Sequence, residues 1–202
     1  PVFPSDDSIQ RLEEFSEKMP ETRQSSKEVL HMLQRLGSPA CVRQTGGRYF
    51  GFVNGNILPV AAASRWLVDV WDQNTALYAM SPVASKLEEV TESWISNLLG
   101  LPESTAMGLV GGSSVATLCA LAAARNSLLA KKGWNVSSDG LFGAPPLRVV
   151  VSEQAHSSVF KALLLVGLGR NRVELVPADS QGRIDLNSLP PLDSSTLVIL
   201  QA

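Results

Sequence analysis

The C-terminal half of the sequence alternates short, mostly apolar segments with longer segments of helical periodicity. The apolar segments are TAMGLV (105–110), LRVVV (147–151), RVELVP (172–177) and TLVIL (196–200), and helical segments cover 113–132 and about 157–168. Strands of this composition are typical of parallel sheets, whose faces are covered by the helices that connect the strands. The sequence therefore predicts an α/β fold with a parallel-rich sheet between helices.

The first hundred residues have a different pattern, because caps and helical spacing predict helices without strands between them. These helices are one capped within 5–7, one from Ser25 or Ser26 to Gly37, one from about Pro59 to Trp71, and one from Pro82 to Gly100 with Ser81 as its cap. Residues 45–59 (TGGRYFGFVNGNILP) have the composition of a loop. We expect two domains, a helical segment with this loop at 1–58 and the sheet-containing domain at 59–202.

Composition argues against several classes of protein. The 202 residues are 45% hydrophobic and 18% charged, and the net charge of −2 comes without a block of Lys or Arg, so neither nucleic acid nor a membrane is an expected partner. Cys41 and Cys119 lack metal-ligand spacing, so we expect no metal. Cys119 on an apolar helix face indicates a reduced thiol and the cytoplasm. Residues 1–15 lack the features of a signal peptide.

The last predicted strand ends at residue 200, and the sequence given ends at Ala202. A domain with a parallel sheet seldom stops there, because the next strand and its covering helix are missing. We therefore expect the chain to be one part of a larger polypeptide.

The stretch LVGGSSVATL (109–118) is the strongest candidate for a binding site. Two glycines allow close approach to the backbone, and Ser113 and Ser114 stand at the start of a long helix, whose N-terminus favours an anion. This combination suits a phosphate group, although the nucleotide-binding patterns Gly-x-x-x-x-Gly-Lys-Ser/Thr and Gly-x-Gly-x-x-Gly are absent. The alternative is that Gly-Gly makes a turn and a serine only caps the helix.

His156, in VVVSEQAHSSVFKA (149–162), is the second candidate. It follows an apolar strand, at the edge of a parallel sheet where α/β proteins bind ligands. The alternative is a helix cap or a packing residue. His31 lies on a predicted surface helix without other polar groups nearby in sequence, and we assign it no function.

Three motifs in order carry a resemblance to a known family. SPVASKLEEVTESWISNLLGLPES, GGSSVATLCALAAAR and SEQAHSSVFKAL resemble the successive signatures of the group II pyridoxal-phosphate-dependent amino-acid decarboxylases, which include aromatic-amino-acid, glutamate and diaminobutyrate decarboxylases. The similarity covers roughly residues 40 to 202. It implies the large domain of fold-type-I pyridoxal 5'-phosphate (PLP) enzymes, incomplete here and preceded by a helical segment.

The resemblance also implies roles for individual residues. Gly112, Ser113 and Ser114 would hold the cofactor phosphate, and His156 would stack on the pyridine ring and act in catalysis. The loop YFGFVNGN would face the substrate, with Phe52 and Asn54 as candidates, although packing within the loop is the alternative for each. An amino-acid substrate, a homodimer and a cytoplasmic location are the further implications.

The sequence departs from the family in one respect. None of its six lysines stands in a context like the family's His-Lys motif, so the Schiff-base lysine and the aspartate that pairs with the pyridinium nitrogen are expected beyond Ala202. We therefore expect an L-amino-acid decarboxylase of which this chain supplies half of the site and is inactive alone. Alternatives are another PLP-dependent reaction (aldehyde-forming decarboxylation, lyase or aminotransfer) and a non-catalytic relative.

Overall fold

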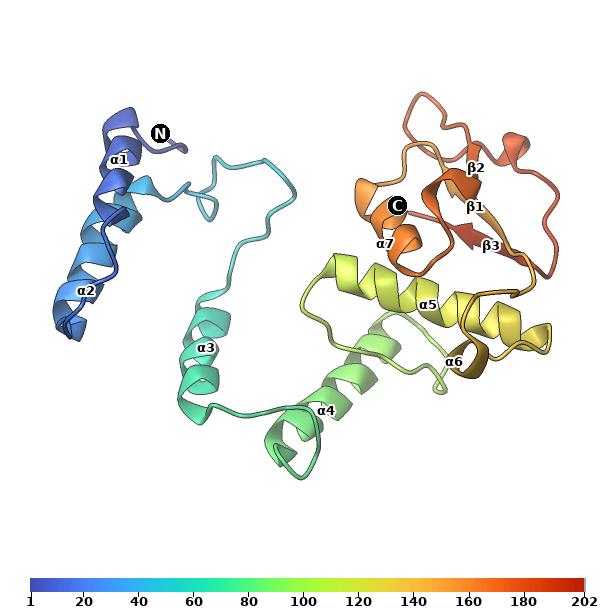
Figure 1. The fold of residues 1–202 in the computed structure, drawn as a ribbon, viewed down its shortest axis with the longest axis horizontal. Coiled ribbons are helices and arrows are strands. Elements are labelled where there is room, and N and C mark those ends of the chain that lie inside the picture. The colour runs from blue at the N-terminus through green and yellow to red at the C-terminus, as the bar shows by residue number, and fades with distance from the viewer. Residues whose placement is uncertain (202) are drawn as a thin grey trace. The chain divides into compact units, whose positions relative to one another are not determined.

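A three-stranded parallel sheet lies at the centre of the C-terminal part of the chain (Figure 1). Its strands are β1 (Arg148–Ser152), β2 (Val173–Val176) and β3 (Thr196–Ile199), in the order β2-β1-β3. Val150 of β1 pairs with Glu174 on one side and with Val198 on the other. Three of the four predicted strands are therefore confirmed, and β1 is hydrogen-bonded along both edges.

The structure, a computed structural model, describes residues 1–201. Contacts divide it into two units, Pro1–Ser85 and Lys86–Ala202. The domain boundary expected between residues 58 and 59 stays a prediction about the complete polypeptide.

The first unit consists of helices and loops, as the capping pattern predicts. Its elements are α1 (Asp6–Gln10), a 3-10 turn (Arg11–Phe15), α2 (Ser26–Met32), a π turn (Leu33–Gly37), a 3-10 turn (Ser38–Ala40) and α3 (Pro59–Trp71), and α4 (Pro82–Leu98) begins within it. The Ser8 amide donates to the Ser5 hydroxyl at the start of α1, and the Ala84 amide donates to Ser81 at the start of α4. Gly100, with φ +63°, ends α4 in the left-handed region.

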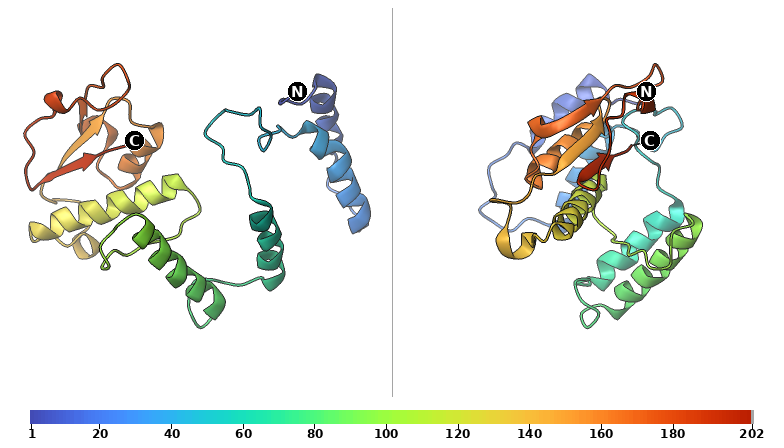
Figure 2. Two further views of the ribbon diagram at one scale, coloured as in Figure 1. Left: turned by 180° about the vertical axis from the view of Figure 1, so that it is seen from behind. Right: turned by 90° about the vertical axis from the view of Figure 1, so that its right-hand side faces the viewer.

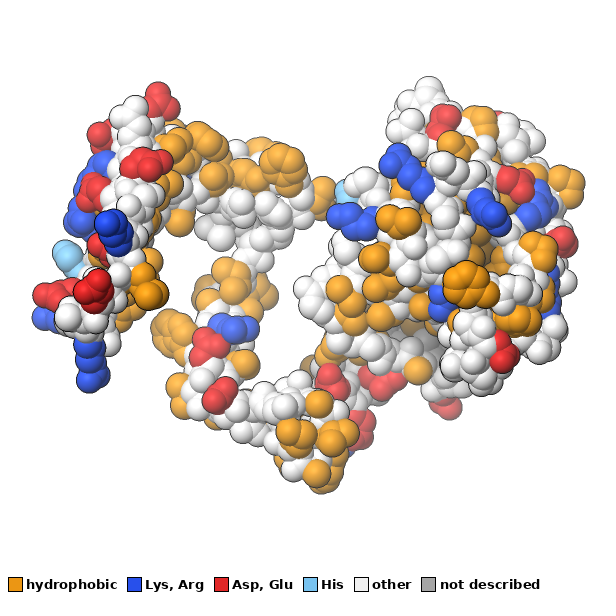
Figure 3. Space-filling view, viewed as in Figure 1, with side chains coloured by type: hydrophobic (Ala, Val, Ile, Leu, Met, Phe, Trp, Pro, Cys, Tyr) orange, Lys and Arg blue, Asp and Glu red, His pale blue; other side chains and the backbone are white. Residues whose placement is uncertain are grey.

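Apolar side chains on α3 are exposed within the described chain. Val60, Trp66 and Val70 are among them. Figure 3 shows hydrophobic side chains on the surface of this helix. An apolar helix surface of this kind is typical of a segment that packs against another domain or subunit.

Helices cover one face of the sheet in the second unit. They are α5 (Ser113–Lys131) and α7 (Ser157–Leu165), and short helical turns occur at α6 (Val136–Asp139), Arg170–Arg172 and Leu186–Ser188. Side chains of α5 and α7 share one core cluster with β1, and the views in Figures 1 and 2 agree that the two helices lie side by side. The alternation of strand and helix in sequence therefore becomes a layer of helices on a layer of strands.

The core is formed where these layers meet. Val149 and Val151 point to one face of β1 because side chains alternate along a strand, and they contact Val159 and Leu163 of α7 and Leu121 of α5. Val150, on the opposite face, is 0% exposed as well. Burial on both faces explains why this strand has three consecutive valines.

The expected strand at 105–110 is wrong. This segment has no strand or helix in the structure, and Leu109 and Val110 are largely exposed. A strand requires hydrogen bonds to a neighbouring strand, and within the described residues the sheet contains only β1, β2 and β3. The apolar composition of residues 105–110 suits a strand, but a strand does not form without a neighbouring strand to pair with.

Two arginines connect neighbouring elements within each layer of the second unit. Arg148 on β1 donates through Nε and Nη2 to both carboxylate oxygens of Glu174 on β2, each at 2.6 Å, and this pairing lowers the pKa of Glu174. Arg125 of α5 donates to the Val166 carbonyl at the C-terminal end of α7, where the helix dipole favours a cation. The strands and the helices are thus tied by charged groups at their margins.

Helix α5 is also long and apolar enough to cross a bilayer by length and composition. Leu121 and Leu129 of α5 are instead buried in this structure, and Leu121 belongs to the core cluster shared with β1 and α7. One face of α5 therefore packs in the core of this unit, while its other residues are at least partly exposed.

Two adjacent leucines of α7 test this core. Leu163 is 0% exposed and Leu164 is 65% exposed. We expect Leu163→Ala to lower the free energy of unfolding by about 2–5 kcal/mol, because it removes buried methyl groups and leaves a cavity, and Leu164→Ala to change it by less than about 0.5 kcal/mol. Urea denaturation of the two variants measures the difference. Equal losses would contradict the packing described for α7.

Candidate functional site

The N-terminus of α5 presents unpaired backbone donors. Gly112 precedes the helix, and its carbonyl accepts from the amides of Val115 and Ala116. Within the described residues, the amides and hydroxyls of Ser113 and Ser114 form no hydrogen bond, and both residues are exposed. Two N–H groups, two hydroxyls and the positive end of a long helix together form a donor set for an anion.

The glycines leave the approach to this helix end open. A Cβ built on Gly111 or Gly112 would meet no atom within 4 Å, so the space beside the backbone is free. Neither glycine has a backbone angle that only glycine adopts. Access to the backbone is therefore the structural role that these glycines can have here.

His156 lies between β1 and α7, as predicted, and it is exposed. It is the N-cap of α7, since its Nδ1 atom accepts from the Ser158 amide at 3.2 Å and lies 2.8 Å from the Ser158 hydroxyl. The His156 amide donates to the side-chain oxygen Oε1 of Gln201 at 2.8 Å. The capping alternative is thus observed, and it leaves the other ring nitrogen, Nε2, without a partner in the described residues.

The starts of α5 and α7 lie toward the same edge of the sheet. Arg125, in the second half of α5, reaches the C-terminal end of α7, whereas Leu118 and Leu121, nearer the start of α5, pack in the core that contains Val159. The two helices therefore run in the same direction. The sequence candidates Ser113, Ser114 and His156 consequently belong to one side of this unit, where β1 ends at Ser152.

A cavity of about 400 Å³ adjoins His156 at this edge. It lies between the ends of β1 and β3 and the loop that follows β2, and it is lined by Ser152, Gln154, Ala155, His156, Gly182, Ile184, Leu186, Ile199, Leu200 and Gln201. Apart from the imidazole, the lining contains no titratable side chain. Its size falls within the range of small-molecule sites.

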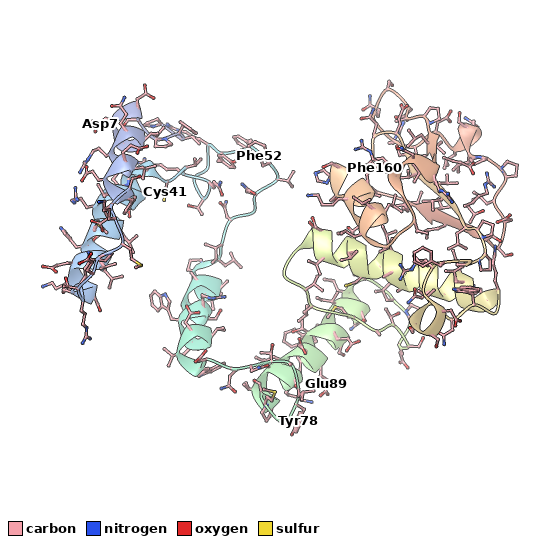
Figure 4. All side chains as sticks on the ribbon, viewed as in Figure 1. Asp7, Cys41, Phe52, Tyr78, Glu89 and Phe160 are labelled. Atoms are coloured by element: carbon pink, nitrogen blue, oxygen red, sulfur yellow. The ribbon has the colours of Figure 1, made fainter. Side chains whose placement is uncertain are left out.

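Phe52 and Asn54 lie in the first unit, whereas the N-termini of α5 and α7 belong to the second. The Phe52 side chain is 91% exposed on the loop (Figure 4), and Asn54 donates to the Tyr49 hydroxyl at 3.5 Å. Phe52 and Val53 have φ of +55° and +54°, which is uncommon for residues with a side chain and costs each of them about 1–3 kcal/mol. Strain of this kind is concentrated at functional sites.

The sequence analysis missed Gln201 and Ser158 as partners of His156. Ser158 follows the histidine by two residues, a spacing at which a helix N-terminal amide meets a cap. Gln201 is 45 residues away, and its only signal in the sequence is that a polar residue follows the end of an apolar strand.

Two kinds of catalytic group, a metal site and a lysine beside His156, are not found among residues 1–201. No group of His, Cys, Asp and Glu there is arranged to hold a metal ion. No lysine lines the cavity beside His156, whose lining also lacks Asp and Glu. The described residues thus provide a helix N-terminus with unpaired donors and an imidazole, and no lysine lines the cavity beside that imidazole.

These features define an α/β protein with unpaired hydrogen-bond donors at a helix N-terminus on one edge of a parallel sheet. The sequence matches the pyridoxal-dependent decarboxylase conserved domain over residues 9–191. The chain therefore belongs to the pyridoxal-dependent decarboxylase family, which confirms the resemblance on which the sequence interpretation is based.

Two curated relatives are named as decarboxylases of aromatic amino acids. The chain is 26% identical over 189 residues to an aromatic-L-amino-acid decarboxylase of Bacillus atrophaeus, an alignment that covers 94% of this chain and 37% of that protein. It is 27% identical over 154 residues to tryptophan decarboxylase 1 of Oryza sativa subsp. japonica, covering 71% of this chain and 29% of that protein. The chain thus spans about a third of the length of these relatives.

Solved structures show the same fold. Mouse CSAD superimposes with a TM-score of 0.81 at 22% identity, over 93% of this chain and 38% of that chain. A second structure is the glutamate decarboxylase domain of diaminobutyrate-pyruvate transaminase and L-2,4-diaminobutyrate decarboxylase from Vibrio parahaemolyticus. It gives a TM-score of 0.84 at 19% identity, over 92% of this chain and 41% of that chain. Oryza sativa TDC, solved with PLP and tryptamine, gives 0.77 at 24% identity, over 92% and 39%. The predicted fold class, that of fold-type-I PLP enzymes, is confirmed.

The helix cap at His156 is testable apart from any reaction. We expect His156→Ala to lower the free energy of unfolding by about 1 kcal/mol, because the Ser158 amide loses its acceptor. For His156→Asn we expect a free energy of unfolding within about 0.5 kcal/mol of the wild type, because asparagine is a good N-cap. Denaturation of both variants provides the measurement. If alanine and asparagine were equivalent, the cap would contribute nothing to stability.

Proposed function

We propose that this chain supplies the phosphate-binding and ring-stacking part of a PLP-dependent L-amino-acid decarboxylase. The observation that carries the proposal is the placement of the unpaired amides and hydroxyls of Ser113 and Ser114 on the same side of the sheet as His156. Family membership supports the cofactor, since the family is described as pyridoxal-dependent. Relatives that decarboxylate amino acids support the reaction class.

The residues present fit the phosphate of the cofactor. A phosphate accepts several hydrogen bonds and carries about −1.5 to −2 charges near pH 7, and the start of α5 offers donors without acceptors. The space beside Gly111 and Gly112 leaves room for such a group next to the backbone. In this proposal Gly112, Ser113 and Ser114 bind the phosphate.

His156 fits the flat face of a pyridine ring. Its imidazole is planar and exposed beside the cavity, and the cap at Nδ1 restrains the orientation of the ring. An aromatic group stacked on the cofactor would keep the cofactor ring flat against the protein. The Nε2 atom of His156 would then contact the substrate carboxylate or transfer a proton. His156 is therefore the catalytic residue that we assign within this chain.

When bound, PLP serves as an electron sink for the charge that remains when the carboxylate of the amino acid departs as CO2. The cofactor also needs a lysine for its carbonyl carbon. No lysine lines the cavity next to His156. We accordingly propose that the lysine and the acid that pairs with the pyridinium nitrogen come from outside residues 1–202, and that these residues alone do not turn over.

The substrate side of the site is assigned to the loop with Phe52 and Asn54. The support is its aromatic and amide side chains and its strained backbone at Phe52 and Val53. An aromatic amino acid fits such a loop, in agreement with the names of the curated relatives. Product analysis with labelled amino acids separates decarboxylation from lyase, aminotransfer or aldehyde-forming reactions of the same cofactor.

We further propose that the protein acts as a homodimer in the cytoplasm. The exposed apolar side chains of α3 support a subunit contact, since a monomer seldom leaves so much apolar surface on one helix. Support for the cytoplasm comes from the thiols of Cys41 and Cys119, which form no disulfide with each other. Neither nucleic acid nor a membrane is a partner in this proposal, given the net charge of −2.

Phosphate binding is tested by removing both hydroxyls. In the holoenzyme, we expect Ser113→Ala with Ser114→Ala to weaken PLP binding by about 1–3 kcal/mol for each hydrogen bond lost, because each is charge-assisted. Equilibrium dialysis of PLP measures the change. Thr117→Val is the matched control, since the Thr117 hydroxyl already donates to the Ser113 carbonyl within the helix. Unchanged affinity in the double variant would refute this assignment.

The catalytic role of His156 is tested with a substitution that keeps the cap. We expect the His156→Asn holoenzyme to fold and to retain PLP absorbance, while turnover falls by about 10²-fold or more because the stacked imidazole and its Nε2 atom are lost. Steady-state rates of CO2 release give the measurement. Normal turnover in this variant would leave His156 with the capping role alone.

A further inference from the structure

His156 is held at two atoms by groups from two different elements. Its backbone N–H donates to Oε1 of Gln201, at 2.8 Å, and its ring atom Nδ1 accepts from the Ser158 amide, at 3.2 Å. Ser158 belongs to α7, whereas Gln201 follows the end of β3 at Ile199. The histidine is therefore fixed both to its own helix and to a strand 45 residues further along the chain.

The two hydrogen bonds restrain different parts of the residue. The bond to Ser158 restrains rotation of the ring. The bond to Gln201 restrains the backbone at an exposed point of the junction between β1 and α7. On either side of this point, the Glu153 amide donates to the Val176 carbonyl and Val159 packs in the core. Because β3 pairs with β1, the Gln201 contact ties the start of α7 to the far side of the central strand.

The Ser158 contact also determines which nitrogen of the neutral ring carries the proton. A nitrogen that accepts a hydrogen bond from an amide has no hydrogen of its own, so the proton of neutral His156 lies on Nε2. Nε2–H is then the group that the ring offers to a ligand. Its position depends on where the backbone of His156 is held.

We propose that Gln201 is a positioning residue for His156, an inference that deepens the proposed function and depends on it for its effect on turnover. The amide oxygen of Gln201 sets the position of the His156 backbone, and the cap at Ser158 sets the ring, so that Nε2–H is presented in one place. Small displacements of a catalytic group are costly, since about 1 Å can reduce a rate by about 10²-fold.

Gln154 provides a matched control. It is a glutamine that lines the same cavity and is exposed, and within the described residues its side chain forms no hydrogen bond. Gln154→Leu replaces an amide side chain of the cavity lining by an apolar one, as Gln201→Leu does. It leaves the acceptor of the His156 amide in place.

The experiment compares three variants of the holoenzyme with the wild type: Gln201→Leu, Gln201→Glu and Gln154→Leu. Leucine removes the acceptor at position 201, and glutamate retains an acceptor oxygen at the same chain length. The first readout is hydrogen exchange of the peptide that contains the His156 amide, measured after PLP is removed. The second readout is kcat, KM and PLP affinity of the holoenzyme.

We expect the His156 amide of Gln201→Leu to exchange about fivefold to tenfold faster than that of the wild type, as follows from the loss of one hydrogen bond. We also expect kcat to fall by about tenfold, with KM and PLP affinity within about twofold. Gln201→Glu should restore the slow exchange, and Gln154→Leu should match the wild type in exchange of the His156 amide.

Unchanged exchange in Gln201→Leu, or exchange in Gln201→Glu as fast as in Gln201→Leu, would overturn the proposal. Faster exchange together with an unaltered kcat would overturn it as well, because the hydrogen bond would then be only structural. A wild-type protein that binds PLP but releases no CO2 from any amino acid would refute the proposed function alone, and the exchange of the His156 amide would still decide whether Gln201 holds it.

Discussion

The burial of β1 is the constraint on which the rest of the second unit depends. This strand is hydrogen-bonded on both edges, to β2 and β3, and its three valines are buried on both faces. Helices α5 and α7 pack side by side on the face with Val149 and Val151. They run in the same direction, since Arg125 in the second half of α5 contacts the C-terminal end of α7. The N-terminal ends of two helices therefore come to the edge where β1 ends. The donor groups at that edge follow from the packing of the core.

His156 combines a structural and a proposed catalytic role at this edge. As the N-cap of α7 it accepts from the Ser158 amide, and this leaves only Nε2 free for a ligand. A cap and a ligand group are compatible here because they use different nitrogens of one ring. In this proposal, the second role is the reason why a histidine occupies a position where serine, asparagine or aspartate is the usual choice.

Much of the fold was predictable because local signals and the final structure agree. The caps at Ser5 and Ser81, the stop at Gly100 and the apolar runs of β1, β2 and β3 correspond to observed elements. The segment 105–110 is the exception, since it has the composition of a strand but no neighbouring strand among the described residues. Apolar composition indicates that a segment is suited to burial. Strand formation also requires a neighbouring strand with unpaired backbone N–H and C=O groups.

The candidate site divides in a similar way. The sequence by itself determined the chemistry of the donors at Gly112, Ser113 and Ser114, the presence of an imidazole after a strand, and the family, because these depend on residue type and spacing along the chain. Only the tertiary structure decided that Gln201 holds the His156 backbone and that α5 and α7 begin at the same edge. Contacts between residues far apart in sequence arise from the pairing of strands and the packing of helices, which local patterns do not record.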